Sequence, residues 1–288
     1  MTPTSMPPSE HVLWSGTVRT KSFAERLEAA TIGGFDALSM APLECQQFTT
    51  GEDGLSPREV RETIEESDVD VTVLDPFTKW VPTWDPPADI PGLDLAFFDF
   101  DADSFFEMAG ALDVDSITVF EPFTSDLDPT EGAEGFGAVC DWAAEHDMGV
   151  HLEFIPRTGV PDLETAWEIV RRADRQNGGL VFDTWHYLRG TRNGELLATL
   201  PGDRIFHVQL TDAHAELRGS FEEDMLHHRV PLGEGDLELE PVMEILSDIG
   251  GLSSVGIELF SDDFDDLSPE AAGQRAGRNL RDFLDTVA

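Results

Sequence analysis

Apolar and polar positions along the chain repeat with two different periods. Short apolar runs predict buried β-strands at His11–Ser15, Asp36–Met40, Val69–Leu74, Ser116–Phe120, Val150–Phe154, Leu180–Asp183, Ile205–Leu210 and Val255–Phe260. Stretches with apolar residues at helical spacing lie between these runs and predict helices at Phe23–Thr31, Pro57–Glu66, Ala102–Leu112, Glu134–His146, Asp162–Asp174, Leu239–Ile249 and Pro269–Val287. Strands that alternate with helices indicate a parallel sheet with helical crossovers.

The number of strand–helix units narrows the fold class further. With a weaker helical segment around residues 193–199 as the remaining crossover, eight strand–helix units in 288 residues predict a closed (β/α)8 barrel. We interpret residues 1–288 as one domain, with residues 1–10 as a flexible N-terminus. The alternative is an open, doubly wound sheet, but no glycine-rich phosphate loop follows the first predicted strand. Two connections, Phe77–Phe100 and Thr211–Glu238, are long enough to predict functional loops.

The charge balance changes the picture of the surface. The chain has 58 acidic residues against 18 lysines and arginines, which gives a formal net charge of −40. The acidic residues are spread along the whole sequence, so they predict a folded protein with an acidic shell suited to a high-salt cytoplasm. Such a surface repels phosphate backbones and argues against nucleic-acid binding.

Other features of the composition favour a cytoplasmic protein. No run of about 18 apolar residues is present, and the first residues lack the pattern of a signal peptide. The two cysteines, Cys45 and Cys140, have no metal-type spacing, and a protein without disulfides is the simplest interpretation.

Polar residues occupy the ends of the last four predicted strands. Glu153, Asp183, Gln209 and Glu258 each lie in or just after an apolar run. In a barrel of this type the carboxyl ends of the strands carry the active site, so the four side chains should meet at its mouth. Three carboxylates in one place would repel one another, and a divalent cation removes that repulsion. Carboxylate and amide oxygens suit Mg²⁺ or Mn²⁺, so the sequence predicts one metal site of these four residues.

The second half of the chain resembles the xylose-isomerase-like TIM barrels. This family includes sugar and sugar-phosphate isomerases and epimerases, inosose-processing enzymes and 3-dehydroshikimate dehydratases. The resemblance runs from about Gly149 to Phe260 and rests on "HLEF", "FDTWH", "IFHVQLTDA", "RVPLGEGDLEL" and "IELF". It implies that Glu153, Asp183, Gln209 and Glu258 bind one divalent metal. Gln209 departs from the usual histidine, a substitution that occurs in some dehydratase-like members.

The resemblance also implies roles for residues around the metal. Glu153 and Glu258 would remove and return a proton next to a carbonyl, while the metal stabilises the enediolate. His186, three residues after Asp183, would bind a substrate oxygen or assist proton transfer. The alternative interpretation of Glu153 and Glu258 is a pair of solvated carboxylates at the barrel rim, and that of His186 is a histidine that caps the loop with Tyr187 packed beneath it.

Three further residues are candidates for substrate binding. Arg229 precedes the turn "PLGEGD" and could hold a hydroxyl, a carboxylate or a phosphate. Glu121 could bind substrate or form an ion pair with Arg157 or Arg189. His207, like His151, lies two residues before a predicted ligand, so a hydrogen-bonded core histidine is an equal interpretation.

The sequence therefore predicts a metal-dependent isomerase or epimerase of a small sugar, sugar phosphate or cyclitol. A lyase of the 3-dehydroshikimate dehydratase type, using the same site, is the alternative. More distant alternatives are a nuclease like the AP endonucleases, which the charge and Gln209 disfavour, and a barrel that binds without catalysis. The expected partners are a small polyol or keto substrate and further copies of the chain, as a dimer or tetramer.

Overall fold

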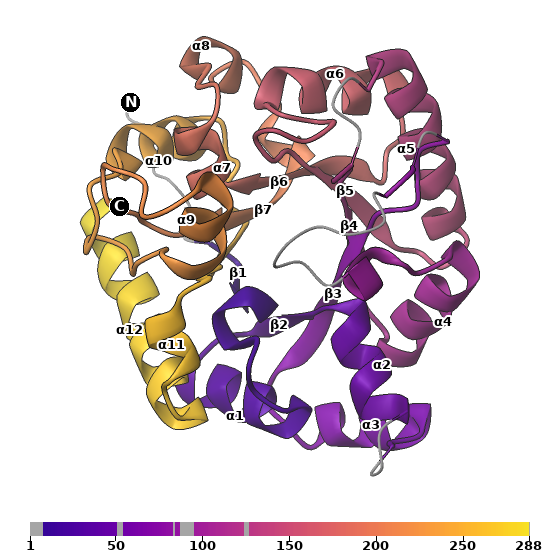
Figure 1. Cartoon of the computed structure of the whole chain (residues 1–288), viewed down its shortest axis with the longest axis vertical. Coiled ribbons are helices and arrows are strands. Elements are labelled where there is room, and N and C mark those ends of the chain that lie inside the picture. The colour runs from indigo at the N-terminus through magenta and orange to yellow at the C-terminus, as the bar shows by residue number, and fades with distance from the viewer. Residues whose placement is uncertain (1–7, 51–53, 83, 87–94, 124–126, 288) are drawn as a thin grey trace.

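The structure is a computed structural model that describes residues 8–50, 54–82, 84–86, 95–123 and 127–287. Its eight parallel strands pair in sequence order and close into a barrel (Figure 1). The predicted (β/α)8 barrel is thus confirmed, and the open-sheet alternative is wrong. The strands are β1 (Glu10–Leu13), β2 (Ala37–Met40), β3 (Asp70–Phe77), β4 (Ser116–Val119), β5 (Gly149–Glu153), β6 (Gly178–Asp183), β7 (Ile205–Leu210) and β8 (Ser254–Ile257).

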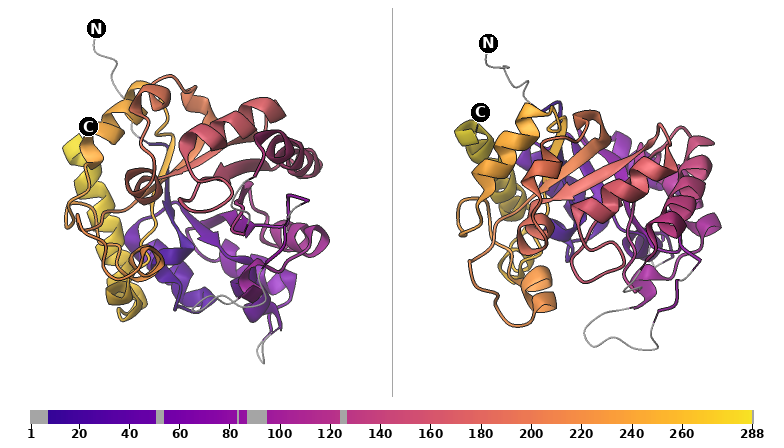
Figure 2. Two further views of the ribbon diagram at one scale, coloured as in Figure 1. Left: turned by 45° about the horizontal axis from the view of Figure 1, so that its top comes forward. Right: turned by 90° about the horizontal axis from the view of Figure 1, so that it is seen from above.

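Helices surround the barrel on its outside, as Figures 1 and 2 show. They are α1 (Phe23–Gly33), α2 (Pro42–Thr50), α3 (Pro57–Glu65), α4 (Ala102–Leu112), α5 (Pro129–Ala144), α6 (Leu163–Ala173), α7 (Thr184–Arg189), α8 (Gly194–Leu197), α9 (Phe221–His227), α10 (Leu239–Asp248), α11 (Asp262–Asp265) and α12 (Pro269–Val287). Short 3₁₀ turns occur at Ser15–Val18, Leu95–Phe98 and Gly202–Arg204.

Some elements differ from the sequence prediction. Helix α2 was not predicted, because "PLECQQFTT" has no continuous apolar face. Helix α5 begins five residues before the predicted Glu134, because the Asp128 side chain accepts a hydrogen bond from the backbone of Thr130 and caps the helix there.

Two predicted segments fall partly outside the described residues. Of the N-terminal segment 1–10, only residues 8–10 are described, and Glu10 already belongs to β1. The predicted loop Phe77–Phe100 is described apart from residues 83 and 87–94.

The interior of the barrel follows the two-residue period of its strands. His151 and His207 lie two residues before Glu153 and Gln209 and are therefore farther from the mouth. The two rings lie 4.7 Å apart, and both bond to the Ser116 hydroxyl, His151 at 3.0 Å and His207 at 3.4 Å. The polar groups inside the barrel thus occupy at least two levels.

Candidate metal centre and substrate cavity

Three adjacent strands deliver polar side chains to the mouth of the barrel. In the sheet register Asp183 pairs with Gln209, and Glu153 pairs with Val181, two residues before Asp183. Glu153, Asp183 and Gln209 are all buried, with exposed fractions of 6%, 1% and 0%. The parallel register therefore gathers two carboxylates and an amide at one edge of the barrel.

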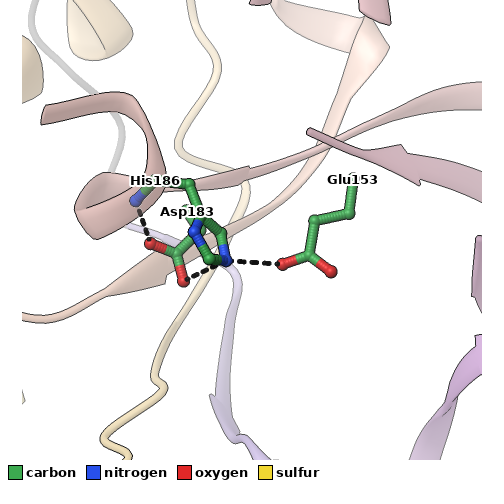
Figure 3. A group of neighbouring side chains, drawn as sticks. All are labelled: Glu153, Asp183 and His186. Carbon is green, nitrogen blue, oxygen red and sulfur yellow. Dashed lines mark hydrogen bonds and ion pairs between the residues drawn. The ribbon is translucent and has the colours of Figure 1, made fainter. Parts of the chain in front are cut away.

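The turn after β6 adds an imidazole to this group. Asp183 is the N-cap of α7, and its Oδ1 accepts a hydrogen bond of 2.9 Å from the backbone N–H of His186. This cap places the His186 Nε2 atom 3.5 Å from Glu153 Oε1 and 3.8 Å from Asp183 Oδ2 (Figure 3). Ligand atoms of the three residues all lie within 4.8 Å of one another, a spacing that can hold a metal ion.

Arg229 neutralises part of the charge at this group. Its side chain is 1% exposed, and Nη1 donates to Asp183 Oδ2 at 2.7 Å. The guanidinium lies 5.1 Å from the Trp185 ring and 5.0 Å from the Phe260 ring. Burial opposes ionisation of Asp183, but the charges of Arg229 and then His186 hold its pKa below the usual value.

Glu258 follows β8 and is 4% exposed. Burial raises its pKa well above the usual value, and the nearby carboxylates of Glu153 and Asp75 raise it further. Glu258 is not part of the close group of Glu153, Asp183 and His186, although it lines the same cavity. The mouth therefore holds more negative charge than Arg229 alone can balance.

Gln209 has an unusual environment for a buried amide. The residue has no exposed surface, and neither Oε1 nor Nε2 has a hydrogen-bond partner among the described residues. A buried amide without hydrogen-bond partners reduces the stability of the fold. An amide oxygen beside two carboxylates suits a hard divalent cation.

The cavity above these residues has a volume of about 390 Å³. Asp75, Glu153, His186, Arg229 and Glu258 supply polar groups. Much of the remaining wall is apolar and includes Phe97, Phe98, Phe120, Ile155, Phe221 and Phe260. A largely apolar cavity with a few convergent polar groups is typical of a small-molecule site.

Two predicted substrate-binding residues lie elsewhere. Glu121 is fully buried, its Oε1 accepts a hydrogen bond of 3.2 Å from the backbone of Phe123, and it is not among the residues that line the cavity. His207 Nδ1 bonds to the Ser254 hydroxyl at 2.8 Å, also away from the cavity lining. Burial lowers the pKa of His207 to about 4. The structure thus brings Glu153, His186, Arg229 and Glu258 to the cavity, but not these two.

Two residues of the site region were missed from the sequence. Asp75 lines the cavity from β3, and its signal was an aspartate after the apolar run "VTVL", the same pattern as Asp183.

Asp212 fixes the loop "PLGEGDL". Its Oδ2 accepts the N–H groups of Gly233 and Gly235 at 3.1 Å each, and its Oδ1 accepts that of Leu237 at 3.0 Å. A side chain at Gly235 would collide with Asp212, since a Cβ there would lie 2.4 Å from Oδ1.

Comparisons with known proteins agree with this architecture. The chain is 27% identical over 243 residues to a 3-dehydroshikimate dehydratase of Pseudomonas aeruginosa, which covers 83% of this chain and 36% of that protein. It is 31% identical over 146 residues to an inosose isomerase of Bacillus subtilis, covering 50% of this chain and 51% of that protein. The chain therefore spans only about a third to a half of these relatives.

Solved structures give the same fold. The structure of the IolI protein with a bound zinc atom superposes with a TM-score of 0.81 at 20% identity, covering 97% of this chain and 99% of that one. The family described as xylose isomerase-like TIM barrel matches residues 27–284. The chain therefore belongs to the xylose isomerase-like TIM barrel family.

Proposed function

We propose that the chain is a divalent-metal-dependent isomerase or epimerase that acts on a small sugar, sugar phosphate or cyclitol. The observation that carries this proposal is the buried group of Glu153, Asp183 and His186 beside the unpartnered amide of Gln209. Glu153 and His186 of this group line a mostly apolar cavity of about 390 Å³, a size suited to a small molecule, whereas Asp183 and Gln209 lie outside its lining.

The residues fit a divalent cation. Glu153, Asp183, Gln209 and Glu258 would hold it, and their oxygen donors favour Mg²⁺ or Mn²⁺. Three carboxylates and one arginine leave an excess of negative charge, which supports the presence of a cation. When bound, the ion supplies a positive charge that polarises a carbonyl oxygen.

Glu153 and Glu258 are the proposed proton-transfer residues. Both line the cavity, Glu153 at the end of β5 and Glu258 after β8. Each can take a proton from a carbon beside a carbonyl or return one to it. His186 also lines the cavity and would bind a substrate oxygen or assist this transfer. Arg229 would hold a substrate oxygen or anion in addition to its contact with Asp183.

A lyase is the second candidate, because two observations favour it. The dehydratase relative covers 83% of this chain, and position 209 is the amide that occurs in dehydratase-like members. Elimination of water β to a carbonyl begins with the same proton abstraction, so Glu153 and Glu258 would keep their roles.

The expected partners follow from surface and fold. In the described part of the chain, no helix is both long enough and apolar enough to cross a bilayer. The charge of −40 supports a cytoplasmic protein adapted to high salt and argues against nucleic-acid substrates. We also propose that the chain assembles as a dimer or tetramer and binds a small polyol or keto compound.

A substrate panel tests the proposed function. Purified protein in high salt is incubated with ketoses, inososes and 3-dehydroshikimate, with Mn²⁺ or Mg²⁺ and with a chelator as control. An isomerase incorporates solvent deuterium next to the carbonyl, whereas a lyase gives an unsaturated product with new ultraviolet absorbance. Both activities should disappear with the chelator and in Glu258→Gln, but persist in Glu234→Gln, a change on the exposed loop. Absence of exchange and turnover with every compound and metal would overturn the proposal.

A further inference from the structure

Asp75 lies at the carboxyl end of β3, away from the strands that carry the proposed metal ligands. In the closed barrel β3 is four strands from β7, so it stands across the mouth from Gln209. The Asp75 side chain lines the same cavity as Glu153 and Glu258. It is therefore an additional carboxyl group in the cavity, and it comes from a strand that carries no proposed metal ligand.

The environment of Asp75 gives it no counter-charge. It is 9% exposed, and no basic group of the described residues forms an ion pair with it. Burial raises its pKa well above the usual value, and the charge of Glu153 raises it further, while the Thr118 hydroxyl offsets this in part. A buried carboxyl group among other acids reduces the stability of the fold.

Another buried acid of the chain shows what a structural carboxylate looks like here. Glu44 Oε1 lies 2.7 Å from Arg26 Nη2, and its Oε2 accepts the backbone N–H of Ala41 at 3.0 Å. Both side chains of that pair are largely buried, with exposed fractions of 3% for Arg26 and 17% for Glu44. Asp75 has no comparable partner, so its presence is not explained by packing or pairing. Buried charged groups without a partner are expected at functional sites, where stability is given up for activity.

We propose that Asp75 binds a substrate hydroxyl from the β3 side of the cavity, a side that carries none of the proposed metal ligands. The inference rests on the proposed function and deepens it. The substrate would carry one set of oxygens at the carbonyl end and a further hydroxyl at the other end. Its carbon skeleton would lie against the aromatic wall of Phe98, Phe120 and Phe260. A keto-polyol satisfies this arrangement, whereas a compound that lacks the remote hydroxyl leaves the carboxyl group without a partner.

The first experiment needs no substrate. Thermal unfolding of the metal-free protein is compared with that of Asp75→Asn and of Glu44→Gln as a matched control. Asp75→Asn removes a buried carboxyl group that has no basic partner and should raise Tm by about 2 °C or more, whereas Glu44→Gln takes the ion-pair partner from Arg26 and should lower it. A fall in Tm for Asp75→Asn, as for Glu44→Gln, would show a structural role and overturn the inference.

The second experiment measures binding and turnover of the panel compounds on Mn²⁺-loaded protein. Asp75→Ala and Asp75→Asn should retain bound Mn²⁺, with KM for the active keto-polyol about 10- to 100-fold higher, since a hydrogen bond to a charged group is lost. Unchanged KM and unchanged ligand-induced thermal shift in both variants would overturn the inference alone. A wild-type protein that neither binds nor converts any panel compound would overturn the proposed function instead.

Discussion

Asp183 is a proposed metal ligand and also one half of a buried ion pair at the barrel mouth. Its Oδ2 accepts a bond of 2.7 Å from Arg229 and its Oδ1 one of 2.9 Å from the backbone of His186. Both Asp183 and Arg229 are at most 1% exposed. An Asp183→Asn substitution keeps the size of the side chain and removes its charge, so the buried guanidinium loses the carboxylate that it is hydrogen-bonded to.

The structure sets the size of the effect. Removal of one partner from a buried ion pair costs about 3–5 kcal/mol, because the other charge stays desolvated. Loss of the Asp183 charge also relieves its repulsion of Glu258, so the expected loss of stability lies at the lower end of this range. We therefore expect the free energy of unfolding of the metal-free protein to fall by about 3 kcal/mol, or roughly 6–12 °C in Tm.

A double-mutant cycle provides the assay. Urea unfolding is measured for the wild type, Asp183→Asn, Arg229→Met and the double variant, all without metal. The double variant should recover part of the stability lost in Asp183→Asn, since it no longer buries a guanidinium that lacks its ion-pair partner. A coupling free energy below about 0.5 kcal/mol would refute the argument that this pair stabilises the mouth. Metal content, measured by mass spectrometry, should fall in Asp183→Asn independently of stability.

Three further predictions follow from the same structure. His186→Ala should keep its metal and lose roughly 10²–10⁴ in rate if the imidazole transfers a proton, and loss of the metal in this variant would make His186 a ligand instead. The pKa of His207 is about 4 in the fold, so below pH 6.5 the unfolded chain binds more protons and stability should fall by up to about 3 kcal/mol as pH drops toward 4. In His207→Gln this acid loss, measured by urea unfolding at pH 7 and 4.5, should shrink, and an unchanged loss would contradict the assignment. Finally, Tm should be higher above about 1 M KCl than at about 0.1 M, because salt screens the net charge of −40, and an equal or lower Tm would give the acidic shell another purpose.

The fold was accessible from the sequence because each strand is a short apolar run between helical stretches. The two-residue period also placed Asp183 beside Gln209, and the sheet register agrees with that placement. The prediction of the polar groups on β5 to β7 thus required only local patterns and the rule that the carboxyl ends of parallel strands lie at the same end of the barrel.

The remaining features depend on contacts between distant segments. The pairing of Asp183 with Arg229 joins residues 46 positions apart, and no local pattern encodes it. The bonds of His207 to Ser116 and Ser254 depend on the closure of the barrel. Asp75 did carry a local signal, but the predicted strand ended at Leu74, whereas β3 extends to Phe77.

The anchoring of the loop after β7 by Asp212 has a consequence for when the loop becomes ordered. One carboxylate holds the backbone of Gly233, Gly235 and Leu237, so this loop is ordered when the barrel folds. The entropic cost of ordering these residues is therefore part of folding, and it does not reduce the affinity for a ligand. Their amide protons should accordingly exchange with solvent as slowly as those of the barrel strands, with or without ligand.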